Sequence, residues 1–395
     1  MSAPPKSRDD FRIGIVCALA LEHNAVSQIV DEFWDETRLG KSARDPNTYS
    51  IGRIADANVV LVLSGMGANS SLSATTRLLD SYPNLELVLV TGICGGVPDP
   101  LSGEELLLGD VVISKAVVQH DFGRRYPDSF EVKDTLDDRL GRPTRNIRNF
   151  VARLETDRAR ERLEDRAASL LGELQFRANE KHRAANYQYP GTNKDHLFPS
   201  SYRHKHHSNC ETCSDHSVNV CHVSRKLSCR ELGCDNKQLV PRSRLEKNKS
   251  LENSGRVNEA QAPFVFVGHI GSGNTVLKSG EERDRLAQAY NLIAFDMEAA
   301  GAWDDTPCII VKGVSDYADS HKNKKWKNFA AATAAAVSRA LIEQYTMADN
   351  PNKKGASDDE CSRMDSGGPV FHGDVSGSNI LTGFHSSGTQ TFNFG

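Results

Sequence analysis

Short apolar runs alternate with helical stretches along most of this chain, and this rhythm constrains the fold more than any other feature. The first runs occupy residues 11–17, 59–63, 85–91 and 111–118. The stretches between them, such as 21–33 and 70–81, have the character of helices. A continuous apolar run is typical of a strand that is covered on both faces, and helices between strands provide that cover. The sequence therefore predicts an α/β fold with a covered sheet.

The rhythm is interrupted once. Residues 141–261 open with a charged segment, predicted as a helix over 148–174, and continue as irregular sequence rich in His, Asn, Ser and Lys. After the insertion, apolar runs return at 264–270, 293–295 and 308–313. An Ala-rich helix is then expected over 326–345. We predict one domain, 11–346, that contains an insertion at 141–261.

Both ends of the chain depart from this pattern. Residues 1–10 are polar, and we expect them to be flexible. Residues 347–366 have the polar, charged composition of a linker. Residues 367–395 are almost free of charge and rich in Gly, Ser, Thr and Asn. That composition fits either a disordered tail or the stacked strands of an amyloid-like assembly motif.

Composition excludes several classes of protein. The chain has 48 Lys and Arg against 52 Asp and Glu, a net charge of −4, which argues against a protein that coats nucleic acid. No apolar run approaches the roughly 18 to 20 residues that span a bilayer. Nine cysteines in 395 residues are few for a disulfide scaffold. We expect a cytoplasmic protein with no membrane span and no nucleic-acid partner.

Polar groups and glycines follow the ends of the predicted strands. Open α/β sheets bind ligands at this edge, and glycine loops there expose backbone N–H groups to oxygen-rich ligands. Taken singly, each feature also has an ordinary explanation as a helix cap, a dipole partner or a tight turn. The features are Glu22, the SGMG loop 64–67, the TGICGG loop 91–96, His120, FDMEAAG at 295–301 and GVSDYAD at 313–319.

In this order the pieces resemble the purine nucleoside phosphorylase and nucleosidase superfamily, in particular methylthioadenosine/S-adenosylhomocysteine nucleosidases and their fungal relatives. The resemblance covers about 11–140 and 262–346. It rests on IGIVCALALE, SGMG, TGICGG, GDVVIS, HDFG, GSGNTVLKSG, FDMEAAG and GVSDYADSH. It implies a three-layer α/β/α sandwich with a twisted mixed, mostly parallel central sheet. It also implies cleavage of an N-glycosidic bond and, as in many relatives, a homo-oligomer.

The resemblance assigns roles to individual residues. It implies that Asp316 donates a proton near purine N7, oriented by Ser315, and that Glu22 activates water. Glu298 would bind the ribose hydroxyls, and Met297 would pack against the sugar. The other substrate-binding positions that it implies are Ser64, Met66, Gly67, Ile93, Cys94, Gly95, His120, Asn274 and Val276.

Glu22 favours hydrolysis over phosphorolysis. Phosphorylases of the superfamily carry a phosphate-binding Arg near this position, and residues 17–22 contain none. The alternative is a purine or uridine phosphorylase that takes its cation from Arg124 or Arg203. A second alternative is a non-catalytic nucleoside sensor, although a sensor needs no acid and base together.

The insertion raises two further hypotheses. Its cations, Lys194 and Arg203 among them, could contact the phosphates of an adenine nucleotide such as ATP; otherwise they form a solvated basic loop and the substrate is a free nucleoside. Its cysteines could hold a structural zinc ion; otherwise they are reduced loop cysteines. The zinc candidates are Cys210, Cys213, Cys229 and Cys234. The proposed chemistry itself needs no cofactor.

A hydrolase joined to an uncharged C-terminal motif is similar to fungal signalling proteins of innate-immunity type. That likeness implies that 367–395 receives an activating signal from a receptor partner, and that 11–346 is the effector acting on a small purine nucleoside or nucleotide.

Overall fold

The computed structural model describes residues 3–100, 103–135, 137–181, 185–208, 210–213 and 220–347. The predicted tail 367–395 and all of the predicted linker except Met347 lie outside the described residues. Residues Met1–Met347 form one compact unit. Among the helices of the described residues, none combines the length and apolar character that crossing a membrane requires.

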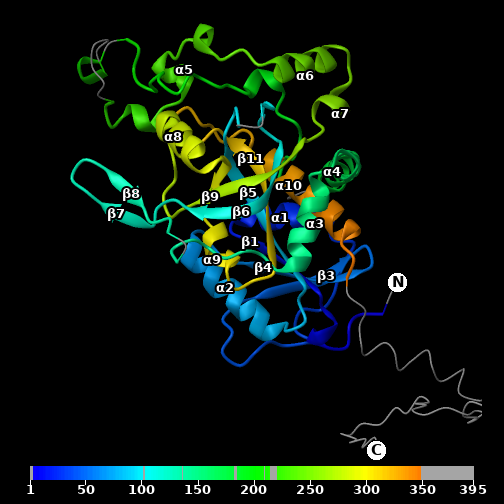
Figure 1. The fold of residues 1–395 in the computed structure, drawn as a ribbon. Coiled ribbons are helices and arrows are strands. Elements are labelled where there is room, and N and C mark those ends of the chain that lie inside the picture. Colours follow the sequence, from blue (N-terminus) through cyan, green and yellow to red (C-terminus); the bar gives the residue numbers. More distant parts are fainter. Residues whose placement is uncertain are drawn as a thin grey trace, which may run out of the picture. The chain divides into compact units, whose positions relative to one another are not determined.

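A nine-stranded mixed sheet runs through this unit in the order β10-β9-β6-β11-β5-β1-β4-β3-β2 (Figure 1). A small hairpin of β7 (Gly123–Arg125) and β8 (Phe130–Val132) forms a separate sheet. The nine strands are β1 (Ile13–Cys17), β2 (Glu32–Phe33), β3 (Tyr49–Ile54), β4 (Ala57–Leu63), β5 (Leu87–Gly96), β6 (Val111–Gln119), β9 (Val265–Ser272), β10 (Leu292–Asp296) and β11 (Cys308–Asp316).

Parallel pairing dominates the centre of the sheet. Strand β1 lies parallel to β4 and β5, and β5 lies parallel to β11. Strand β10 also pairs antiparallel with the end of β5, where Phe295 faces Gly95. Gly95 in turn faces Asp316 of β11. This second pairing of β10 brings the ends of three strands, and the three sequence motifs that they carry, to one place.

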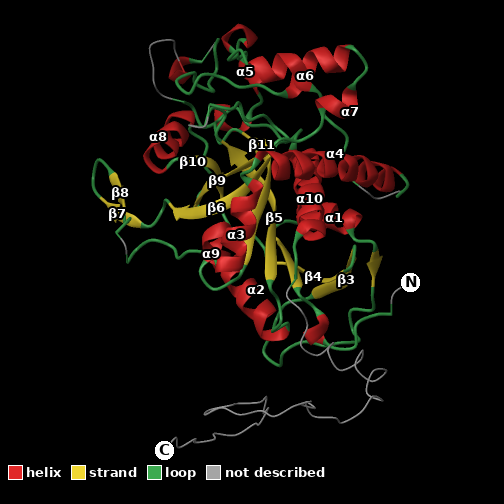
Figure 2. Ribbon diagram, turned by 45° about the vertical axis from the view of Figure 1, so that its right-hand side comes forward, coloured by secondary structure: helices red, strands yellow, loops and turns green. Residues whose placement is uncertain are grey.

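Helices cover both faces of the sheet (Figure 2). On one face α1 (Ala20–Ile29), α4 (Asp157–Asn179) and α10 (Lys327–Gln344) pack on one another and on the central strands. On the other face α2 (Ala68–Ser81) packs against α9 (Ala299–Trp303). The predicted α/β/α architecture is therefore confirmed. The remaining helices are α3 (Arg145–Leu154), α5 (Cys229–Leu232), α6 (Ser243–Asn253), α7 (Val257–Ala260) and α8 (Gly280–Tyr290).

Helix α10 lies unusually close to strand β11. A Cβ atom at Gly313 would overlap the carbonyl group of Ala330, so only glycine fits the strand there. The helix contributes a face of small, fully buried residues such as Ala331, Ala334 and Ala335. This contact fixes the first turn of α10 relative to the end of β11.

Several local predictions were wrong. The helix expected over 21–33 ends at Ile29, because Glu32 and Phe33 pair with β3, a strand that the apolar runs did not predict. The helix expected over 148–174 is two helices, with a break after Leu154. Residues Arg8–Asp10, expected to be flexible, form a short 3₁₀ helix.

The segment 141–261 divides into two structural parts. Helix α4 packs on α10, and its Leu170, Leu171 and Leu174 are buried in the main core. Its Arg166 makes a bidentate ion pair of 2.7 and 2.9 Å with Glu343 of α10. Helices α3 and α4 thus belong to the sandwich. The described residues from 185 to 261 form a separate layer that includes α5, α6 and α7, and we call this layer the cap (Figure 1).

Candidate active site

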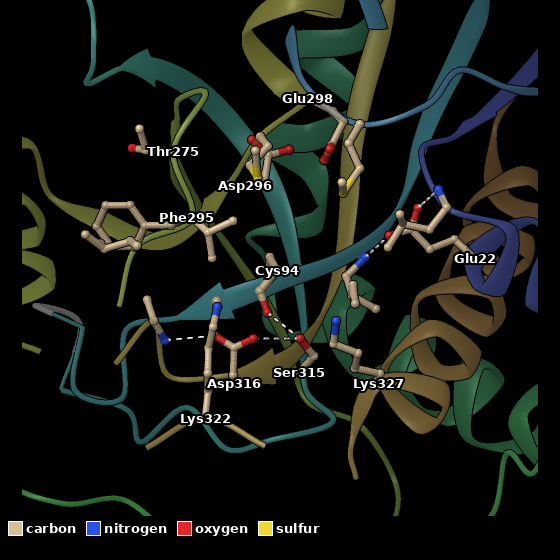
Figure 3. A pocket seen from close by; sticks show the side chains of 18 of the residues that line it. Glu22, Cys94, Thr275, Phe295, Asp296, Glu298, Ser315, Asp316, Lys322 and Lys327 are labelled. Carbon is tan, nitrogen blue, oxygen red and sulfur yellow. Dashed lines mark hydrogen bonds and ion pairs between the residues drawn. The ribbon is translucent and has the colours of Figure 1, made fainter. Parts of the chain in front are cut away.

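A cavity opens where β5, β10 and β11 end, and carboxylates face it from three sides (Figure 3). Glu22 comes from α1, Glu298 from the turn after β10, and Asp316 from the end of β11. The lining consists of Leu19, Glu22, Met66, Ile93, Cys94, Gly95, His120, Thr275, Val276, Leu277, Phe295, Asp296, Met297, Glu298, Ser315, Asp316, Ala318, Lys322 and Lys327.

Backbone N–H groups hold the Glu22 carboxylate. Ala18 and Leu19 each donate to Oε2 at 2.9 Å, and Ile93 donates to Oε1 at 2.9 Å. A Cβ atom at Gly92 would overlap this carboxylate, so the glycine of the TGICGG loop is what lets Glu22 lie against β5. Burial raises the pKa of Glu22, while the charge of Lys312 and the backbone donors oppose that rise. The result is a buried carboxylate with a fixed orientation.

Asp316 is held by its own neighbours in the chain. Ser315 Oγ lies 3.1 Å from Oδ2 and also donates to the carbonyl oxygen of Cys94 at 3.2 Å. The N–H of Ala318 donates to Oδ1 at 3.0 Å, and Lys322 Nζ lies 3.5 Å from the same oxygen. Ala318 has a φ of +51°, an uncommon conformation for a residue with a side chain. The turn after Asp316 is therefore shaped around its carboxyl group.

Glu298 shares a buried lysine with Asp296. Lys312 is fully buried, and its Nζ lies 3.0 Å from Glu298 Oε2 and 3.5 Å from Asp296 Oδ2. Burial alone would lower the pKa of Lys312, but the adjacent carboxylates raise it, so the ammonium stays charged. The N–H of Gly67 donates to Glu298 Oε1 at 3.3 Å. Burial would raise the pKa of Glu298, yet Lys312 and these donors lower it overall.

An aromatic and apolar wall completes the cavity. His120 packs edge to face on Phe295, with ring centroids 5.7 Å apart. Burial lowers the pKa of His120, which favours the neutral imidazole. Met66 and Val276 are more than half exposed, at 60% and 53%, although they line the cavity. A flat aromatic ring suits this wall.

Most residues singled out in the sequence come together here, but several do not. Among the residues described as lining the cavity, Ser64, Gly67 and Asn274 are absent. Ser64 Oγ donates to the carbonyl of Gly65, and Asn274 donates to Asp121, so both act within adjacent loops. Gly67 reaches the site indirectly, through its hydrogen bond to Glu298.

The structure does not bring the predicted phosphate contacts to this cavity. Arg203 pairs with Glu281 at 2.8 Å, and Lys194 presents its carbonyl to the indole N–H of Trp326. Arg124 lies on the β7–β8 hairpin. None of these three cations is among the residues that line the cavity.

The sequence reasoning missed three lysines. Lys322 and Lys327 line the cavity, and Lys312 joins its buried carboxylates. Lys312 had a recognisable signal, because a lysine inside an apolar strand must find a counter-charge. Lys322 and Lys327 carried none, since a run of lysines before a helix usually faces solvent.

The four candidate zinc ligands do not share one place. They divide between two groups that also contain histidine: His206, Cys210, Cys213 and Cys221 in one, and His204, Cys229 and Cys234 in the other.

The cap grips the residue that follows Asp316. Tyr317 is buried, and its hydroxyl lies 2.9 and 3.0 Å from the carboxylate oxygens of Asp195. Arg242 hydrogen-bonds the same hydroxyl and pairs with Asp195 at 2.7 Å. Both Asp195 and Arg242 belong to the cap. The cap thus anchors the residue next to Asp316, whereas Glu22 is held by the sandwich.

Several known proteins are similar to parts of this chain. A family model described as the phosphorylase superfamily matches residues 12–169. Over 346 residues the chain is 28% identical to a nucleotide-binding leucine-rich repeat (NLR)-like protein of Hyaloscypha variabilis, covering 86% of this chain and 30% of that protein. Over 76 residues it is 42% identical to a 5'-methylthioadenosine/S-adenosylhomocysteine nucleosidase of Mycobacterium bovis, covering 19% of this chain and 27% of that one. The chain thus spans less than a third of these relatives.

Solved structures also match over most of this chain. A 5'-methylthioadenosine/S-adenosyl homocysteine nucleosidase of Helicobacter pylori matches with a TM-score of 0.48 at 14% identity, over 85% of this chain and 99% of that one. A futalosine hydrolase of Helicobacter pylori matches with a TM-score of 0.47 at 15% identity, over 85% and 98%.

Proposed function

We propose that this chain, which a model of the phosphorylase superfamily matches over residues 12–169, hydrolyses the N-glycosidic bond of a purine nucleoside and releases the free base. The observation that carries this proposal is the convergence of Glu22, Glu298 and Asp316 on one cavity. An N-glycosidase needs a base for water, a hydrogen-bond partner for the sugar and an acid for the leaving base, and three carboxyl groups can fill these roles.

Glu22 acts as the general base in this proposal. It takes a proton from water, and the water oxygen forms a bond to the anomeric carbon of the sugar. Its three backbone donors keep the carboxylate in place, and the raised pKa brings it closer to neutral pH, where a base is more effective.

Asp316 acts as the general acid. As the bond between the sugar and the base breaks, its electron pair passes to the purine, and Asp316 protonates the ring nitrogen that would otherwise carry the charge. Ser315 Oγ lies within hydrogen-bond distance of both the Asp316 carboxyl group and the carbonyl oxygen of Cys94, so it fixes the orientation of the acid.

Glu298 orients the sugar. Lys312 and the Gly67 N–H fix its carboxylate and keep it ionised, so that it can accept hydrogen bonds from two ribose hydroxyls. Fixed acceptors in a partly desolvated cavity position the anomeric carbon between base and acid, which lowers the entropic part of the barrier.

Hydrolysis is favoured over phosphorolysis by charge. A phosphate nucleophile beside an ionised Glu22 would meet repulsion of about 4 kcal/mol per pair of unit charges at 4 Å and an effective dielectric constant of ~20. Arg124 and Arg203 do not line the cavity, whereas Lys322 and Lys327 do, so the dependence of the product on phosphate decides between the two reactions.

The test is a product assay with adenosine and inosine, run with and without phosphate. Chromatography of base and sugar should show free ribose at a rate that does not depend on phosphate. Formation of ribose-1-phosphate would make the chain a phosphorylase, and ligand binding without any base release would make it a sensor.

An adenine nucleotide, such as ATP, is the second candidate substrate. The observation that favours it is that Lys322 and Lys327, two ammonium groups, line the cavity. Parallel incubations with ATP, AMP and adenosine, with free adenine as the readout, separate the candidates. Release of adenine from adenosine alone would exclude the nucleotide.

We propose, finally, that residues 11–346 are the effector of a fungal immune-type signalling protein. The similarity to an NLR-like protein over most of the chain supports this. The predicted activating tail, 367–395, lies outside the described residues. Deleting it should leave turnover intact in the isolated protein while removing any assembly and any receptor response. Loss of turnover on deletion would contradict this division of roles.

A further inference from the structure

Thiol and imidazole groups of the cap gather in two places. The first thiol cluster consists of His206, Cys210, Cys213 and Cys221, and the second thiol cluster consists of His204, Cys229 and Cys234. Within each cluster, all of the candidate ligand atoms lie within 4.8 Å of one another. His204 and His206 are two positions apart in the sequence, yet each belongs to a different cluster.

The spacing in the first thiol cluster matches a tetrahedral metal site. Nδ1 of His206 lies 3.5 Å from the sulfur of Cys221 and 3.8 Å from that of Cys213. A zinc ion with bonds of about 2.3 Å to sulfur and about 2.0 Å to nitrogen separates its ligand atoms by roughly 3.5 to 3.8 Å. Three cysteines and one histidine are a common ligand set of structural zinc.

Backbone donors support thiolates in this cluster. The N–H of Cys221 points to the sulfur of Cys213 at 3.4 Å, and the N–H of Ser224 points to the sulfur of Cys221 at 3.4 Å. The thiolate is the form of cysteine that binds metal, and N–H donors aimed at the sulfur stabilise its negative charge.

The second thiol cluster has an oriented histidine. Nε2 of His204 lies 2.9 Å from the carbonyl oxygen of Leu227, which can only accept, so Nε2 carries the proton. This leaves the lone pair of Nδ1 directed at the sulfurs of Cys229 and Cys234, at 3.7 and 3.8 Å. A backbone carbonyl that fixes the free nitrogen of a ligand histidine is typical of metal sites.

The cap has little apolar core to hold it together. Its fully buried apolar side chains within the described residues from 185 to 261 are few: Tyr187, Leu197, Phe198, Cys213, Leu232 and Ala260. Segments that bury so little commonly need metal ions or disulfides as cross-links. The two thiol clusters lie where such cross-links would act.

We propose that each thiol cluster binds one Zn²⁺ ion and that the two ions stabilise the cap. The first ion takes all four ligands from the protein; the second takes three and keeps one position for water. The second cluster also abuts the loop after Asp316. The sulfur of Cys229 lies 3.9 Å from the carbonyl oxygen of His321, whose ring packs on that of His204 with centroids 5.0 Å apart.

The first test is the metal content of the full chain, purified without a polyhistidine tag and without chelator. Elemental analysis should give about two equivalents of zinc per chain. Replacement by Co²⁺ should produce thiolate-to-metal charge-transfer bands of the intensity expected for five thiolates. Less than half an equivalent of bound metal would overturn the proposal, whatever the enzymatic activity.

Paired variants assign the two sites. Cys210→Ser/Cys213→Ser and Cys229→Ser/Cys234→Ser should each lower the zinc content from two equivalents to one, and Cys308→Ser, at a cysteine of β11 that belongs to neither cluster, should leave it at two. A single equivalent in the unmodified chain that either double variant abolishes would overturn the assignment of two sites.

If the variants do not fold, mercurial titration of the unmodified chain replaces them. Two zinc ions should then be released as five thiols react, and five freely reactive thiols with no release would refute both sites.

Discussion

The two sides of the cavity are built differently. On one side Glu22 is held by backbone groups of the sandwich, from the end of β1, the start of α1 and the middle of β5. On the other side Asp316 lies in a turn whose next residue, Tyr317, is clamped by Asp195 and Arg242 of the cap.

Under the proposed function, each layer controls a different step of the reaction. Water activation depends on the sandwich alone, whereas protonation of the leaving base depends on the cap as well. Substrates with a good leaving group need no acid, so a comparison of a purine nucleoside with 4-nitrophenyl riboside separates the two sides.

The largest effect is expected for Glu22→Gln. The variant lacks the base, and kcat should fall by about 10²- to 10⁴-fold with both substrates. Steady-state assays with the two substrates measure this, and Glu36→Gln, an exposed glutamate, is the matched control that should keep full activity. A variant that loses activity only with the purine nucleoside would contradict the role of Glu22.

Asp316→Asn should lower turnover of the purine nucleoside but not of 4-nitrophenyl riboside. Without the acid, turnover of the purine nucleoside should again fall by about 10²- to 10⁴-fold, while turnover of 4-nitrophenyl riboside should change little. The ratio of the two kcat values is the measurement. Equal losses with both substrates would remove the acid role from Asp316.

Arg242→Met tests the clamp of the cap. The substitution leaves the buried Asp195 carboxylate without its ion-pair partner, so the free energy of unfolding should fall by about 3 to 5 kcal/mol. Urea titration measures this loss. Under native conditions the remaining activity should fall more for the purine nucleoside than for 4-nitrophenyl riboside; an equal fall would show that the cap does not act through Asp316.

Gly92→Ala tests the Glu22 side. The new Cβ would overlap the Glu22 carboxylate, so overpacking should lower the free energy of unfolding by about 1 to 3 kcal/mol. Displacement of the base should lower kcat with both substrates, by up to about 10²-fold. Gly172→Ala is the control, because no heavy atom lies within 4 Å of that added Cβ in α4. It should stabilise the helix by about 0.5 to 1 kcal/mol and leave kcat unchanged.

The smallest effect is a displacement of the pH profile. Burial raises the pKa of Glu22 from its ordinary value of 4.5, and a protonated Glu22 cannot accept a proton from water. The acidic limb of kcat should therefore lie above pH 4.5, with activity lost as the pH falls through the raised value. Measurement with 4-nitrophenyl riboside isolates this group from Asp316. An acidic limb of kcat at or below pH 4.5 would contradict a raised pKa of Glu22 or its role as the base.

The features that could be predicted from the sequence are those that depend on residues close together in the chain. The apolar runs at β1, β5 and β11 were visible because covered strands need them, and Glu22 and Asp316 stood out because they follow such strands. The edge strand β2 and its neighbour β3 were missed because their residues are partly polar, and because β2 pairs with β3 and β3 with β4 away from the centre of the sheet.

Long-range partnerships could not be predicted. The role of Lys312 depends on carboxylates at the end of β10, and the sequence of β11 alone does not indicate these partners. The division of the cysteines between two clusters depends on how an irregular loop returns on itself, so His204 and His206 could not be assigned to different groups in advance. The contact between Tyr317 and Asp195 joins residues 122 positions apart.

The close approach of α10 to β11 at Gly313 has a consequence for how molecules enter and leave. Helix and strand are in backbone contact there, so the start of α10, which carries Lys327, is packed directly on the strand that ends in Asp316. Met66 and Val276 also line the cavity, but their side chains are mostly exposed to solvent. We therefore expect substitutions at Met66 and Val276 to change the rates of substrate entry and product release more than the bond-breaking step.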